Sequence, residues 1–417
     1  MPKYSIQDHR MLRSVGWRPE EPAERASDHV LYSRGTTNSN LVVTPDGDVL
    51  VNTGVSNEGP RHRERYESLL GRRLKVRGII LTQYHSDHVG GWSAFTGPGV
   101  ETIANCEQPR LRAEWKTLTP YYQPRGMRFL GAMVRPDTAK KYFQPAAEPE
   151  GVTYFRDSHV FVSGGMRFEL FSISSGETLD SIAVWLPGER TLFVGNFLGA
   201  LYGALPNFYT IRGDRDRSVP GFLRDIQRLI DLEPELLITG HDEPISGHNR
   251  IRTDLCRTRD AVRYIHDETV KGMNAHRDLH TLMREIRLPE HLAPQSGRGP
   301  VHWYVRAVWE EYSGWFMQQS TTELYGVPQR AVWHDLVRLA GGPDKLVDEA
   351  RRFIAERRPL EALHLTDIVV GVEPAHRGAR ETQIHALELL IDQSGGTAFD
   401  EMGWLENEIR QAREALA

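Results

Sequence analysis

The chain has 417 residues, of which 39% are hydrophobic and 26% are charged, and its net charge is −5 at pH 7. That length allows two or three domains, and that composition is ordinary for a globular protein. The slight negative charge gives no reason to expect nucleic acid as a partner, and no window approaches the roughly 18 apolar residues of a membrane span.

The N-terminal stretch from Met1 to Arg13 is polar and contains no apolar core typical of a secretory signal. The two cysteines, Cys106 and Cys256, lie far apart in the sequence. Such sparse cysteines are more typical of reduced thiols than of a structural disulfide. We therefore expect a cytoplasmic protein.

The first 245 residues alternate between strand-like and turn-like patterns. One helical pattern, over residues 219–232, places its apolar residues on a single face. Strands combined with flanking helices predict a layered α/β domain over residues 1–245. The predicted strands are residues 30–33, 40–43, 49–51, 77–81, 100–104, 167–172, 181–186, 191–194 and 235–238.

Beyond about residue 244 the strand signal disappears and amphipathic helical patterns take over. Asp278 has the character of an N-cap for the second of these helices. We therefore predict a second, all-α domain over residues 246–417. Its predicted helices are residues 251–274, 279–286, 301–312, 329–340, 345–356, 383–392 and 404–416.

Four polar turns next to predicted strands carry side chains that bind metals. The first follows strand 77–81 and holds His85, Asp87 and His88 within four residues. The other three are residues 175–181, 192–196 and 237–244. Because a rigid sheet fixes the geometry of the loops at its strand ends, we expect these segments to converge on a divalent metal.

These four segments, in this order, resemble the metallo-β-lactamase fold superfamily, whose first loop reads H-x-H-x-D-H. The resemblance covers roughly residues 28–245 and implies an αββα sandwich. It also implies two metal positions, the first including Gln83 and His85 and the second including Asp87 and His88. Glu177, Asn196 and His241 correspond to the ligands of the later loops.

Segments outside these loops resemble the alkyl sulfatases of this superfamily, among them residues 206–213, 259–267 and 312–316. The resemblance implies that the helical half is a dimerisation domain, and hence a homodimer. It also implies that Asn207 and Arg212 bind a sulfate group, with Tyr209 near enough in sequence to assist. The third, sterol-carrier-like domain of these enzymes is not expected in a chain that ends at Ala417.

Two positions depart from the family pattern. Gln83 stands in place of a histidine, and Asn196 stands in place of a bridging carboxylate. A neutral amide is a weaker zinc ligand than imidazole or carboxylate. We therefore predict one strong metal position at Asp87, His88 and His241, and one weak or empty position at Gln83, His85 and Glu177. Zinc is the expected ion, with iron or manganese as alternatives.

These residues predict a metallohydrolase that cleaves an ester-type bond in a small and partly apolar molecule, and the resemblance to alkyl sulfatases implies that this bond could be a sulfate ester. Metal-bound hydroxide would attack, Asp87 would orient it, and Arg212 would stabilise the developing charge. Two alternatives remain open at this point. One is an iron-dependent oxygenase or an enzyme that cleaves an ether or activated aromatic bond. The other is a non-catalytic paralogue that binds a ligand or a partner subunit.

Overall fold

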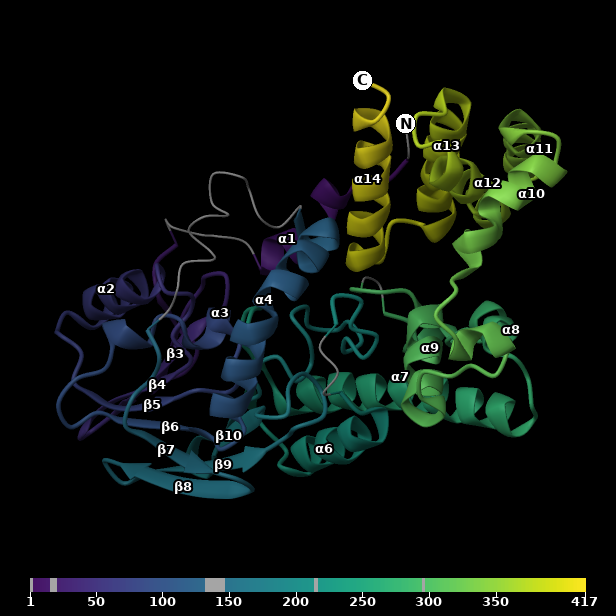
Figure 1. Ribbon diagram of the computed structural model, residues 1–417. Coiled ribbons are helices and arrows are strands. Elements are labelled where there is room, and N and C mark those ends of the chain that lie inside the picture. The colour runs from purple at the N-terminus through teal and green to yellow at the C-terminus, as the bar shows by residue number, and fades with distance from the viewer. Residues whose placement is uncertain (1–2, 16–20, 132–146, 214–216, 295–296) are drawn as a thin grey trace. The chain divides into compact units, whose positions relative to one another are not determined.

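The computed structural model describes residues 3–15, 21–131, 147–213, 217–294 and 297–417 (Figure 1). The chain divides into two compact units. The sandwich unit consists of Arg10–Pro124 and Met133–Val308, and the helical unit consists of Met1–His9, Arg125–Ala132 and Trp309–Ala417. The compact units therefore divide the chain elsewhere than at residue 245, and that domain boundary stays a prediction.

The sandwich unit contains two β-sheets. The first has the order β1-β2-β3-β4-β5-β6-β7, antiparallel up to β4 and parallel from β4 to β7. Its strands are β1 (Glu24–Arg25), β2 (Val30–Ser33), β3 (Ser39–Thr44), β4 (Gly47–Val51), β5 (Val76–Ile80), β6 (Glu101–Asn105) and β7 (Val152–Phe155).

The second sheet has the order β13-β12-β11-β10-β9-β8, and only its β11–β12 pair is parallel. Its strands are β8 (Ser158–Ser163), β9 (Met166–Ser172), β10 (Ile182–Leu186), β11 (Thr191–Phe193), β12 (Leu236–Ile238) and β13 (Ile245–Ser246).

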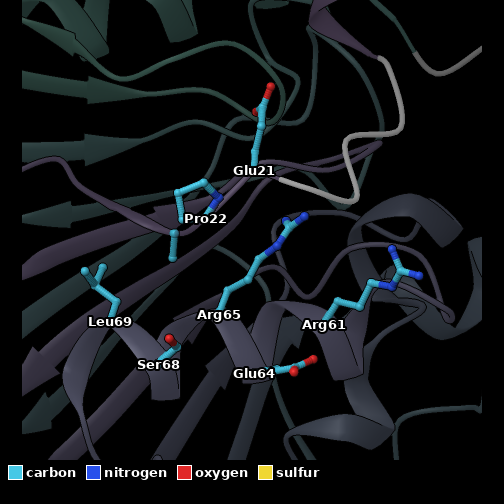
Figure 2. Close-up of a pocket in the computed structure, with 8 residues that line it drawn as sticks. Glu21, Pro22, Arg61, Glu64, Arg65, Ser68 and Leu69 are labelled. Atoms are coloured by element: carbon cyan, nitrogen blue, oxygen red, sulfur yellow. The ribbon is translucent and has the colours of Figure 1, made fainter.

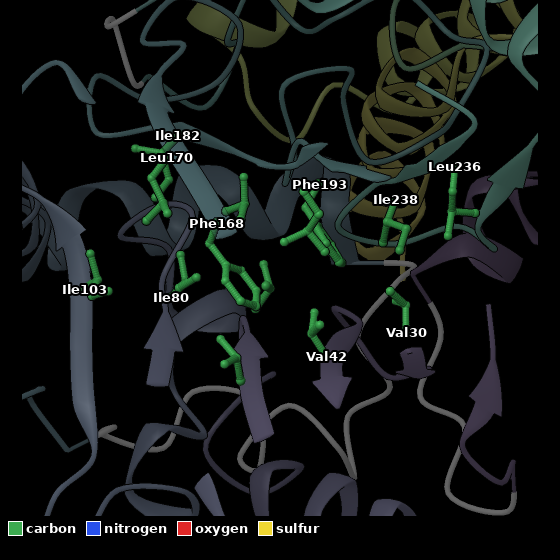
Figure 3. Close-up of a cluster of buried hydrophobic side chains, with 14 of the residues drawn as sticks. Val30, Val42, Ile80, Ile103, Phe168, Leu170, Ile182, Phe193, Leu236 and Ile238 are labelled. Carbon is green, nitrogen blue, oxygen red and sulfur yellow. The ribbon is translucent and has the colours of Figure 1, made fainter. Parts of the chain in front are cut away.

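The main core lies between the two sheets, where side chains from both meet in one buried cluster (Figure 3). Val49 and Val51 of β4 belong to this cluster, together with Phe168 and Phe193 from the second sheet. Leu50, between the two valines, belongs instead to a cluster on the outer face of the first sheet. Burial on both faces explains why these strands read as continuous apolar runs.

Helices cover the outer faces of both sheets. On the first sheet, the outer cluster includes Tyr66 of α2 (Gly59–Leu70) and Val89 of α3 (Ser86–Val89). On the second, α6 (Val219–Asp231) places the Arg228 guanidinium 3.7 Å from the centre of the Phe171 ring on β9. The helix α7 (His248–Asn274) contacts β12 and β13. The predicted αββα sandwich is confirmed.

The C-terminal helices confirm the predicted all-α half. Neighbouring helices pack through small and branched residues, such as Ala350, Ala362 and Ala386 in one cluster. Asp278 caps α8 as predicted, since its side chain accepts a hydrogen bond from the Thr281 N–H at 2.9 Å. The helices are α8 (Leu279–Glu285), α9 (Val301–Ser313), α10 (Trp333–Leu339), α11 (Pro343–Ala355), α12 (Pro359–Val372), α13 (Arg377–Ser394) and α14 (Phe399–Glu414).

Every predicted strand overlaps an observed one, but the sequence patterns missed several elements. The largest is α4 (Gln108–Leu130), which contains Pro120 and Pro124, residues that normally end a helix. Among the described residues, every helix is too short or too polar to cross a bilayer. The other missed helices and strands are α1 (Met11–Ser14), α2, α3, α12, β1, β7, β8 and β13, and α3 replaces part of the predicted polar turn at His85, Asp87 and His88.

Candidate metal centre

Strand ends position the predicted metal ligands. After β5 the chain reaches His85, the N-cap of α3, and Asp87 and His88 lie in the single turn of that helix. Glu177 lies between β9 and β10. Asn196 follows β11 and His241 follows β12. Because β11 and β12 are parallel neighbours, these last two loops leave the sheet at the same edge.

Asp87, His88 and His241 come together. Asp87 Oδ2 lies 3.5 Å from His88 Nε2 and 3.9 Å from His241 Nε2. One potential ligand atom from each residue lies within 4.8 Å of the other two, an arrangement that could hold a metal ion. Three protein ligands with room for a further group are typical of catalytic metal sites. Segments about 150 residues apart therefore meet as the sequence predicted.

Outer hydrogen bonds hold these three side chains in place. His241 Nδ1 donates to the Thr36 carbonyl oxygen at 2.7 Å, which directs Nε2 toward Asp87. The Thr37 hydroxyl donates to Asp87 Oδ2. His88 Nδ1 lies 3.0 Å from Asn52 Nδ2. Such partners fix the orientation of ligand rings and carboxylates before a metal binds.

The protonation states suit metal binding. Burial lowers the pKa of His88 to about 3, so its ring is neutral at physiological pH. Burial alone would raise the pKa of Asp87, but the neighbouring His88, His241 and His85 rings lower it overall, below its usual range. A neutral imidazole and an ionised carboxylate are the forms in which these side chains bind a cation.

Two buried atoms also fit a divalent cation at this site. Within the described part of the chain, His88 Nε2 and Asn196 Oδ1 are buried and have no hydrogen-bond partner. Both side chains border Gly240, where an added Cβ would stand 2.2 Å from Asn196 Oδ1 and 2.9 Å from His88 Cε1. Buried donors and acceptors are normally satisfied, so these atoms fit a site that a metal completes.

The predicted first metal position has a different character. Gln83 Nε2 lies 2.8 Å from His85 Nδ1, and the same ring nitrogen lies 3.6 Å from Glu177 Oε1. Glu177 Oε1 in turn lies 3.2 Å from Arg217 Nη2 and 3.8 Å from Arg212 Nη2. The side chains predicted to hold a first ion are therefore engaged with one another and with two arginines.

The predicted substrate-binding residues lie in the segment that follows the third metal loop. Asn207 Oδ1 accepts a hydrogen bond from the Thr210 N–H at 3.2 Å. The Tyr209 ring packs edge-on against Trp303 and Tyr304, with centroid distances of 5.0 and 5.2 Å. Arg212 lies beside the predicted first metal position, since its Nη2 is 3.8 Å from Glu177 Oε1. The role of each in binding substrate stays a prediction.

Sequence reasoning missed Arg217, Thr36, Thr37 and Asn52. Asn52 has a recognisable signal, because it directly follows the buried strand β4, as the metal loop follows β5. Its Oδ1 accepts hydrogen bonds from the Thr82 N–H and hydroxyl at 2.9 and 3.0 Å, which directs Nδ2 toward His88. For the others, the sequence patterns gave no signal.

A buried carboxylate supports the Thr36 backbone that accepts from His241. Glu58 Oε1 accepts hydrogen bonds from the Thr36 N–H at 2.9 Å and from its hydroxyl at 3.0 Å. Burial raises the pKa of Glu58 from 4.5 to about 7, against the opposing effect of these hydrogen bonds. Between these two pKa values, Glu58 binds its proton more tightly in the folded state than in the unfolded state. Its contribution to the free energy of unfolding therefore decreases as pH rises from 4.5 to about 7.

We expect the variant Glu58→Gln to remove this dependence. The free energy of unfolding of the wild type, minus that of the variant, should fall as pH rises from about 5 to about 8. Urea denaturation at pH 5, 6.5 and 8 measures it. The neighbouring His62 has a pKa that burial lowers to about 3 and contributes an opposite slope. Both proteins keep His62, whose Nε2 lies 3.9 Å from Glu58 Oε2, so the difference measures Glu58 together with its interaction with His62. A flat difference would contradict the assignment.

A surface groove of about 740 Å³ lies between Glu21–Ala23 and the α2 residues from Arg61 to Leu69 (Figure 2). Its charged side chains include Glu21, Arg61, Glu64 and Arg65. None of the predicted metal ligands lines it. A wall of mixed charge favours neither an anion nor a cation, so the groove gives no reason to place the reaction there.

Two family profiles match the chain. That of the Metallo-beta-lactamase superfamily matches residues 32–241, which is half of the chain, and that of Alkyl sulfatase dimerisation matches residues 279–402. A linear primary-alkylsulfatase of a Pseudomonas species is 26% identical over 332 residues, which cover 74% of this chain and 61% of that protein. An alkyl/aryl-sulfatase of Saccharomyces cerevisiae is 23% identical over 406 residues, covering 90% and 62%.

Among solved structures, the stereoselective inverting sec-alkylsulfatase Pisa1 from Pseudomonas sp. superimposes with a TM-score of 0.79 at 19% identity. The superposition covers 99% of this chain and 71% of that one. At this identity the likeness concerns the fold. The chain spans about three fifths of the length of the two curated relatives described above.

Proposed function

Because the chain belongs to the metallo-beta-lactamase superfamily, whose fold implies a divalent metal, we propose that it is a metal-dependent hydrolase that cleaves sulfate esters of small, partly apolar alcohols. The observation that carries the proposal is the convergence of Asp87, His88 and His241 on one point. When bound there, a divalent ion activates water for attack at neutral pH. The similarity to alkylsulfatases supports the sulfate ester as substrate.

Residues of the chain would then bind the metal ion and the substrate. Asp87, His88 and His241 would bind the ion, for which we propose zinc, with iron or manganese as alternatives. Asp87 would also orient the attacking water. Arg212 would bind the anionic sulfate through its planar guanidinium, and the Asn207 amide would add a neutral hydrogen bond.

We further propose that the protein is a homodimer assembled through its helical unit. The match to the dimerisation profile supports this, and so does a run of exposed apolar side chains within that unit. A soluble monomer rarely exposes so many large apolar side chains in one segment. They include Trp315, Tyr325, Val327 and Leu339, all more than 60% exposed. Free thiols at Cys106 and Cys256 support our proposal of a cytoplasmic location.

Removal and return of the metal tests the proposed reaction. We expect the protein as isolated to contain about one zinc, iron or manganese ion per chain and to release inorganic sulfate from a medium-chain alkyl sulfate. Treatment with a chelator should abolish release, and adding back the ion should restore it. Elemental analysis and ion chromatography of sulfate measure both quantities. Metal-free protein with undiminished activity, or loaded protein without hydrolysis, would disprove the proposal.

A further inference from the structure

The Arg217 side chain is buried at the predicted first metal position. It is 1% exposed, and its Nη2 lies 3.2 Å from Glu177 Oε1. Its Nε donates to the Glu177 carbonyl oxygen at 3.0 Å, and its Nη1 donates to the Asn207 carbonyl oxygen. A buried guanidinium needs both a counter-charge and oriented acceptors, and this loop supplies them. The positive charge at this position is therefore the guanidinium of Arg217 itself.

Glu177 is the shared acceptor of this cluster. Its Oε1 is close to Arg217, to Arg212 at 3.8 Å and to His85 Nδ1 at 3.6 Å. His85 Nδ1 is also 2.8 Å from Gln83 Nε2. A divalent ion bound by Glu177 and His85 would have to displace these contacts and lie beside a fixed positive charge. Repulsion between two cations at such distances in a buried site is strong.

We propose that the guanidinium of Arg217 takes the place of a first metal ion, so that the chain binds a single divalent ion at Asp87, His88 and His241. This inference rests on the proposed metal-dependent function. Arg217 then acts as the counter-ion of Glu177. Only one metal ion binds because the arginine is permanently charged, and not because Gln83 is a weak amide ligand.

The test is the number of ions bound per chain. Metal-free full-length protein is equilibrated with excess Zn²⁺, passed through a desalting column and measured by elemental analysis, and titration calorimetry gives the affinities. We expect one ion per chain for the wild type and also for Gln83→His, which restores an imidazole but keeps Arg217. We expect two ions per chain for Arg217→Met, the second bound more weakly. Arg263→Met, which changes an exposed arginine on α7, should retain one ion.

Two ions per chain in the wild type or in Gln83→His would overturn this inference and leave the hydrolase proposal standing. One ion in an Arg217→Met variant with a native circular dichroism spectrum would also overturn it. If Arg217→Met does not fold, the number of ions bound by Gln83→His still shows which feature prevents a second ion from binding. That feature is either the guanidinium of Arg217 or the lack of an imidazole at position 83. No bound ion in the wild type would instead overturn the proposed function itself.

Discussion

Replacing His241 by alanine should empty the metal centre and abolish hydrolysis. His241 is 3% exposed, and it offers one of three potential ligand atoms that lie within 4.8 Å of one another. Two remaining ligands cannot hold a divalent ion firmly, and even outer-shell partners of metal ligands are worth about 10–100-fold in affinity. We therefore expect a loss of metal affinity beyond about 100-fold, with sulfate release falling in parallel. Elemental analysis after dialysis, together with the sulfate assay, measures the effect.

The matched control is His280→Ala, which removes an exposed imidazole from the helix α8. It should keep its ion, its activity and its thermal midpoint. Unchanged metal content in His241→Ala would show that the ion is bound elsewhere. If both variants lost the ion equally, the effect would be one of general stability and the ligand assignment would lose its support.

The variant Gly91→Ala should disrupt the metal loop without removing any ligand. An added Cβ at Gly91 would stand 2.1 Å from the Thr53 carbonyl oxygen and 2.8 Å from Gly59 Cα, both rigid backbone atoms. Two backbone hydrogen bonds in this region connect the metal loop to the segment that follows β4. The Thr53 N–H donates to the His88 carbonyl oxygen at 2.8 Å, and the Gly91 N–H donates to the Gly54 carbonyl oxygen at 2.9 Å. We expect the clash to open this contact and to shift His88.

We expect Gly91→Ala to lower the free energy of unfolding by about 3 kcal/mol, which is the upper range for overpacking, and to weaken metal binding as well. Urea denaturation and zinc titration measure the two effects. Gly188→Ala is the matched control, since Gly188 is exposed and an added Cβ there meets nothing within 4 Å. A stable Gly91→Ala variant with wild-type metal affinity would show that the loop can move away at little cost.

Elements with strong local patterns could be predicted from the sequence. The strands β2 to β6 and β10 to β12 are mostly buried, and β9 alternates apolar and charged residues, so their patterns identify them without tertiary information. The strands β7 and β8 were missed although residues 152–155 and 160–162 are of types that favour strands. Val160 and Val162 of β8 are 44% and 58% exposed, whereas Phe161 between them packs against the main core, so β8 pairs with β9 and buries only one face.

The sequence by itself predicted the residues of the candidate metal centre, because their side chains are of the types that bind divalent cations and they lie in polar turns next to recognisable strands. It also indicated that Gln83 weakens the first metal position. Only the tertiary structure placed Arg217 against Glu177, 40 residues away in the sequence. A guanidinium on a loop has no local pattern that distinguishes a solvated charge from a buried one. That difference depends on which carboxylate the fold brings to it, and on how much water the surrounding chain excludes.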